Sequence, residues 1–285
     1  MPLRGRCSAL LCVLCALCGE VSAADFPIGP DAQVDSLAVA ASASNYLVVW
    51  RDVTQPAAPR VMGATVTTTG VAATAFPISD AAGVPLESPV QRATVAFDGT
   101  RFLVVWADNR TGGAGIRGAL VTQAGSVAGA DVLIAPVSRT NDLAPQAVFT
   151  GTDYLVAWQD NAPSSDGAAS RIFYARVTTA GAAGPVGGLP FTAGQNQSLE
   201  FLVAGAGGET AIIVHDTGAD PHVTRAVRLA ADSSFVGPPE GVLLFKEDFS
   251  VTGFGTPVGA AYAETGTAGT GGEYAVLSSY SPTAL

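Results

Sequence analysis

Tyr46-Leu-Val-Val-Trp50-Arg-Asp52 is the stretch that decides the fold, because the chain spells it again as Phe102-Leu-Val-Val-Trp106-Ala-Asp108 and as Tyr154-Leu-Val-Ala-Trp158-Gln-Asp160. The copies contain all three tryptophans of the chain and return every 52 to 56 residues. A phrase with this spacing indicates a repeat whose unit is longer than a hairpin and shorter than a domain. The sequence therefore predicts a repeat architecture.

Each copy lies inside a unit of four short predicted strands separated by turn residues. β-Branched and aromatic runs bounded by glycine turns, such as those at Gly99 and Gly151, are typical of hairpins and leave no room for a helix. The predicted strands are 37–41, 46–50, 61–67 and 76–78 in unit one, 90–97, 102–107, 116–122 and 132–134 in unit two, and 146–149, 154–158, 172–178 and 189–191 in unit three.

Two further units are spelled less clearly. Aligning Phe201 with Phe249 pairs the two segments without a gap, and Val214 and Tyr262 then stand at the tryptophan position. The five predicted units cover residues 34–79, 89–135, 145–192, 198–245 and 249–280. Four-stranded units at this period are typical of the blades of a β-propeller.

The two ends of the chain complement each other. Unit five ends after three strands, while Phe26-Pro-Ile28 duplicates the fourth strand of unit one, Phe76-Pro-Ile78. We therefore predict an all-β, five-bladed propeller spanning 25–285 as a single domain, closed by the N-terminal strand in a three-plus-one arrangement. A β-sandwich or an open array of modules is the alternative, but an open array has no use for a fourth strand placed first.

The N-terminus predicts export. Arg4 and Arg6 precede an apolar run at 8–18 and the small residues Val21-Ser-Ala-Ala24, which is the order of a signal peptide covering 1–24. All four cysteines lie in this segment, so the mature chain would have neither a disulfide nor a cysteine metal site. A lipid anchor at Cys18 is the alternative, although Leu17 stands where a small residue is expected. The expected location is secreted, periplasmic or at the cell surface.

Charge and composition exclude several partner classes. Without residues 1–24 the chain keeps 12 basic and 23 acidic residues, a net charge of −11. An acidic chain without basic clusters binds nucleic acid and anionic lipid poorly. No second apolar run is long enough to span a bilayer. We expect a monomer that binds no nucleic acid and crosses no membrane.

One acidic position recurs in every unit, two residues after the tryptophan position. A ring of carboxylates on one face could bind a cation or the hydroxyl groups of a glycan. The simpler interpretation is that each carboxylate accepts backbone N–H groups of its own loop, because a residue repeated in every unit serves the repeat. These candidate binding residues are Asp52, Asp108, Asp160, Asp216 and Glu264.

Metal and cofactor signals are weak. The segment from Asp160 to Asp166 is the nearest approach to a calcium loop but lacks the Asp-x-Asp-x-Asp-Gly pattern, so a polar surface loop explains it better. His215 and His222 flank one loop and could ligate a metal only with a third ligand, and their proximity in one loop is better explained by chance. We expect no cofactor and no metal.

Catalytic motifs are equally sparse. No Gly-x-Ser-x-Gly segment could form the nucleophile elbow of a hydrolase. Paired carboxylates on innermost strands could hydrolyse glycosides, as in some five-bladed propellers, but only Glu200 lies in or beside a predicted innermost strand. The Ser-x-Asp-x-Gly-x-Thr-Trp box of sialidases is absent.

The repeated phrase, followed by Ile-x-Gly-Ala-x-Val-Thr and a glycine turn, resembles repeats of large secreted bacterial proteins that are mostly uncharacterised. The resemblance implies an exported propeller-like module and supplies no catalytic residues. The sequence thus favours a non-enzymatic propeller that binds a glycan, protein or other extracellular ligand at its loop-bearing rim. A glycosidase-like carbohydrate-active enzyme and a structural envelope protein are the alternatives.

Overall fold

The computed structural model consists of antiparallel sheets. It describes residues 34–54, 60–79, 93–108, 114–137, 143–161, 170–190, 196–216 and 222–246, and the backbone alone of 256–264 and 272–279. The predicted signal peptide, the strand at 26–28 and the first strand of unit five at 249–253 lie outside the described residues.

Units one to four each form one four-stranded sheet in which neighbours in sequence are neighbours in space. Unit one contains β1 (Val34–Ala41), β2 (Asn45–Asp52), β3 (Arg60–Thr67) and β4 (Phe76–Pro77), and unit two contains β5 (Thr94–Phe97), β6 (Arg101–Asp108), β7 (Gly115–Thr122) and β8 (Val132–Pro136). Unit three contains β9 (Gln146–Phe149), β10 (Asp153–Asn161), β11 (Ser170–Thr178) and β12 (Ala183–Gly188), and unit four contains β13 (Gln197–Ala204), the 3-10 turn η1 (Ala206–Gly208), β14 (Thr210–Asp216), β15 (Val223–Leu229) and β16 (Val242–Lys246). The described part of unit five is the pair β17 (Thr256–Glu264) and β18 (Gly272–Ser279).

Two predicted strands are placed differently. The fourth strand of unit three is β12 and not 189–191, because the turn after β11 leads directly into pairing of Ala183 with Val177. The sheet contact nevertheless continues past β12, since the Leu189 amide donates to the Ile172 carbonyl at 2.9 Å. In unit one the first strand starts earlier than predicted, so that Asp35 falls within β1.

The tryptophans fill the space between successive units. Trp106 and Trp158 are each 1% exposed. Trp106 packs in one cluster with Leu47 and Val61 of the preceding unit, and Trp158 packs with Leu103 of unit two. The second strands are apolar on consecutive residues because both of their faces are covered.

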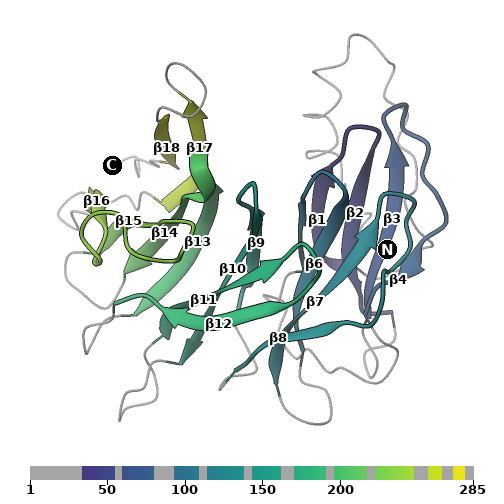
Figure 1. Cartoon of the computed structure of the whole chain (residues 1–285), viewed down its shortest axis with the longest axis horizontal. Coiled ribbons are helices and arrows are strands. Elements are labelled where there is room, and N and C mark those ends of the chain that lie inside the picture. The colour runs from purple at the N-terminus through teal and green to yellow at the C-terminus, as the bar shows by residue number, and fades with distance from the viewer. Residues whose placement is uncertain are drawn as a thin grey trace, which may run out of the picture.

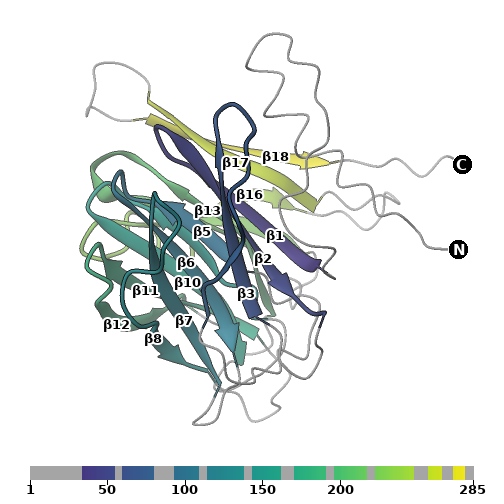
Figure 2. The same cartoon turned by 90° about the vertical axis from the view of Figure 1, so that its right-hand side faces the viewer.

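The sheets follow one another around an arc, from unit one in purple to β17 and β18 in yellow (Figure 1). The first strands form its inner side, since β1 contacts β5, β5 contacts β9 and β9 contacts β13. In Figure 2, β1 and β5 run side by side. The described residues include no helix with the length and apolar character needed to cross a membrane.

A recurring hydrogen bond fixes how units one and two each sit on the following unit. The Asn45 side chain, at the start of β2, donates to the Gln123 carbonyl of unit two at 2.6 Å. The Arg101 guanidinium, at the start of β6, donates to the Thr179 carbonyl of unit three at 2.6 Å. Both pairs are separated by 78 residues, so the repeat specifies the stacking of units as well as their strands.

Candidate functional site

The innermost strand of unit four, β13, is irregular where it pairs with β14. Along β13, Leu199 pairs with Val214 and Phe201 pairs with Ile213, so Glu200 is a bulged residue without a partner in β14. Bulges of this kind re-aim a side chain and are frequent beside active sites. The bulge therefore distinguishes Glu200 from the regularly paired residues of β13.

Glutamines of unit three hold the backbone of the bulge. The Gln146 side chain donates to the Glu200 carbonyl at 2.7 Å and accepts from the Leu202 amide at 3.0 Å. Gln159 accepts from the Leu199 amide at 2.9 Å. Because these side-chain amides satisfy the backbone groups that β14 does not pair, the bulge is a built feature of the interface between units three and four.

Burial acts on the Glu200 carboxyl. The side chain is half-buried on the inner strand, and desolvation raises its pKa above the ordinary value of 4.5. A carboxyl in this environment is a better proton donor near neutral pH than an exposed one. Sequence analysis found Glu200 but neither its bulge nor its supporting glutamines, whose spacing gives no signal of contact.

Asp108 serves the packing of its own unit. Its side chain is fully buried, and its carboxylate accepts hydrogen bonds from Trp106 Nε1 and from Arg117 Nε, both at 3.2 Å. Arg117 also reaches Asp131 at 3.3 Å. Asp108 thus orients the indole that fills the interface with unit one.

The other four recurring carboxylates have different surroundings. Asp52 accepts the Thr54 amide at 2.9 Å, which is a local turn of the kind the simpler interpretation expects. Asp160 is 7% exposed and Asp216 is 2% exposed, and Asp216 lines a cavity. Glu264 ends β17, and its side chain is outside the described residues. Each carboxylate belongs to its own unit, and a shared role for the five stays a prediction.

The two histidines lie together. Their ring centroids are 5.8 Å apart in an edge-on arrangement, and His215 Nδ1 shares a hydrogen bond of 3.1 Å with the Thr224 hydroxyl. Across the ranges that the structure describes, no three histidine, aspartate or glutamate side chains gather as a metal site. The possible calcium loop at 160–166 is almost wholly outside those ranges.

Sequence comparisons give no match, either with a protein-family model or with a curated protein. Solved structures do match. The α-L-arabinanase of Penicillium chrysogenum complexed with arabinobiose has a TM-score of 0.55 at 12% identity, with 90% of this chain and 83% of that chain covered. A thermostable family-43 glycoside hydrolase has a TM-score of 0.47 at 9% identity, with 90% and 87% covered.

A subtype N10 neuraminidase-like protein of A/little yellow-shouldered bat/Guatemala also matches, at 12% identity and a TM-score of 0.47. It aligns with 74% of this chain, and this chain spans 60% of its length.

The arabinanase belongs to a group of five-bladed propellers. The likeness shows a β-propeller fold. It also corrects the expectation of a non-enzymatic binding module, because this propeller fold is carried by a glycoside hydrolase and the carbohydrate-active alternative fits it better. The physical reason is that the recurring carboxylates do not form the site. Those of Asp52 and Asp108 are engaged within their own unit, whereas Glu200, at its bulge, breaks the symmetry of the propeller.

Proposed function

We propose that the protein is an exported carbohydrate-active enzyme in which Glu200 donates a proton to a glycosidic oxygen. The observation that carries this proposal is the half-buried Glu200 carboxyl, with its raised pKa, at a bulge of an innermost propeller strand. General acid catalysis needs a carboxyl that keeps its proton near the working pH, and burial supplies this. The arabinobiose bound to the arabinanase of similar fold makes arabinose-containing oligosaccharides the first substrates to test.

Glycoside hydrolysis ordinarily uses two carboxyl groups on opposite sides of the scissile bond. We assign the second role to Asp35. Its backbone lies at a register shift of β1, between Val34 and Ser36. Among the first strands β1, β5, β9 and β13, these two are the acidic residues.

The proposal includes the whole ring. Five units would surround the axis, with the strand at 26–28 completing unit five after export. The repeat spelling, the duplicated Phe-Pro-Ile segment and the successive contacts of the inner strands support this arrangement. A closed ring would place the inner strands of all units around one central opening, where a glycan could reach Glu200 and Asp35.

The test is hydrolysis by the exported chain of an aryl glycoside panel that includes an aryl α-L-arabinofuranoside, together with arabino-oligosaccharides. Glu200→Gln and Asp35→Asn should each lower kcat by about a hundredfold or more. Glu209→Gln is the matched control, because the Glu209 carboxylate already pairs with Arg228. No hydrolysis by folded protein across the panel would reject the enzyme, and full activity of Glu200→Gln would reject the proton donor.

A further inference from the structure

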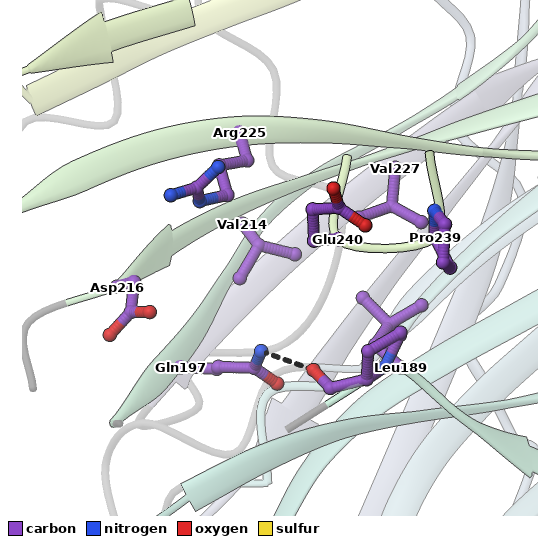
Figure 3. A pocket seen from close by; sticks show the side chains of 9 residues that line it. Leu189, Gln197, Val214, Asp216, Arg225, Val227, Pro239 and Glu240 are labelled. Carbon is purple, nitrogen blue, oxygen red and sulfur yellow. Dashed lines mark hydrogen bonds between the residues drawn. The ribbon is translucent and has the colours of Figure 1, made fainter. Parts of the chain in front are cut away.

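A cavity of about 230 Å³ lies between units three and four (Figure 3). Val214, Val227 and Leu189 supply its apolar wall. Asp216 and Arg225 lie toward one end, and Glu240 lies toward the other end beside Pro239. The cavity thus joins a buried apolar wall to a polar end in the interface between two units.

The register of the sheets explains the empty space. In unit two Trp106 pairs across the strands with Arg117, and in unit four Val214 pairs in the same way with Arg225. Asp216 follows Val214 by two residues, as Asp108 follows Trp106. Val214 therefore stands where units one to three carry tryptophan.

The preceding unit supplies a matching wall. The Ile78 amide donates to the Val61 carbonyl in unit one, and the Leu189 amide donates to the Ile172 carbonyl in unit three. Ile78 packs in the cluster of Trp106, and Leu189 packs in the cluster of Val214. The cavity between Val214 and Leu189 is thus the counterpart, two interfaces further along the chain, of the space that the Trp106 indole fills between units one and two.

We propose that this cavity binds a planar heteroaromatic ring of indole size that carries an N–H donor. The ring would lie against Val214, Val227 and Leu189 and replace the missing tryptophan side chain. Its N–H would donate to the Asp216 carboxylate, as Trp106 Nε1 donates to Asp108 at 3.2 Å. A carboxylate has about four acceptor sites, so Asp216 can accept this bond in addition to its contacts within the protein.

Arg225 adds a second interaction. Its counterpart Arg117 is held by Asp108 and Asp131. Within the described part of the chain the Arg225 side chain makes neither a hydrogen bond nor an ion pair, and it is half-buried at the cavity. A guanidinium in this position can stack on the face of a bound aromatic ring.

The probe is indole, titrated into the full exported chain by calorimetry and followed by ligand-observed NMR. We expect saturable binding at one site. Indene has the same shape without the N–H donor and should bind about tenfold more weakly, because it leaves the carboxylate without that hydrogen bond. Equal affinities for indole and indene would overturn the role of Asp216, and no binding of indole at low millimolar concentration would overturn the site.

Val214→Trp is the blocking variant, since it introduces the side chain that units one to three carry at this position. It should abolish indole binding, whereas Val71→Trp, at a residue 64% exposed in unit one, should leave it unchanged. A folded Val214→Trp protein that binds indole like the parent would overturn the site. Should Val214→Trp fail to fold, Arg225→Ala decides: several-fold weaker binding supports the proposal, and unchanged affinity overturns it. Glu200→Gln should bind indole normally, so this test is independent of glycoside hydrolysis.

Discussion

Trp106 donates its indole N–H to the carboxylate of Asp108, two residues further along the same strand, at 3.2 Å. The same carboxylate pairs with Arg117 on the neighbouring strand. One buried acidic residue therefore fixes the side chain that seals the interface between units one and two. The recurring phrase Trp-x-Asp is, in this unit, a packing device.

Removing the indole should be costly. Trp106→Ala leaves a large cavity between two units and should lower the free energy of unfolding by about 3 to 5 kcal/mol. Denaturant unfolding followed by circular dichroism measures the change. A loss below about 1 kcal/mol would show that the interface closes without the tryptophan.

The recurring carboxylates should differ in their contributions. Asp108→Asn removes the charge of a fully buried carboxylate that pairs with the partly exposed Arg117, and should cost about 2 to 3 kcal/mol. Asp52→Asn keeps an acceptor oxygen for the Thr54 amide and should change stability by less than about 0.5 kcal/mol. Thermal unfolding of both variants compares them, and equal effects would contradict the packing role assigned to Asp108.

The raised pKa of Glu200 predicts a pH-dependent effect of Glu200→Gln on stability. Because the folded state holds the proton more tightly than the unfolded state, the parent loses stability as pH rises from the ordinary pKa of 4.5 through the raised folded value. Glutamine does not ionise, so the variant should be the more stable protein at neutral pH, and the difference should vanish below about pH 4.5. Melting temperatures of both proteins across this pH range measure the difference. If the stability of the variant relative to the parent fell as pH rises, the prediction would be wrong.

Two turn glycines offer a matched test of unit stacking. Gly99 and Gly125 both have positive φ, at 94° and 81°. A Cβ at Gly99 would meet nothing within 4 Å, whereas a Cβ at Gly125 would lie 3.2 Å from both Phe76 and Thr65 of unit one. Gly99→Ala should cost about 1 kcal/mol from backbone strain, and Gly125→Ala about 1 kcal/mol more. Urea unfolding of the two variants should separate them, and identical costs would show that the Gly125 turn can move away from unit one.

The strand order of units one to four is predictable from the sequence, because tryptophan, β-branched runs and glycine turns agree with one another in each unit. The position of β12 is not predictable, since Ala-Gly-Pro-Val-Gly-Gly has weak strand propensity. The more apolar segment that begins at the neighbouring Leu189 is therefore predicted as the strand instead. Pairing with β11 and the preceding turn decide the strand there.

The candidate site is less predictable than the fold. Glu200 is visible in the sequence as an acidic residue near an inner strand, but its bulge depends on Gln146 and Gln159 in another unit. Val214 is equally visible at a tryptophan position. The cavity beside it depends on where the side chains of Leu189 and Arg225 lie relative to each other at the interface, and sequence spacing does not contain that information.

The hydrogen bonds from Asn45 to Gln123 and from Arg101 to Thr179 each join the start of one unit's second strand to a turn of the following unit. A gene duplication that copied one whole unit would copy these donors and acceptors together. Each new interface would then contain both partners of the hydrogen bond. Deleting a turn would instead leave a charged guanidinium or a side-chain amide facing a neighbouring unit that no longer offers its acceptor. The number of units in such a chain can therefore change during evolution more readily than the length of any turn between them.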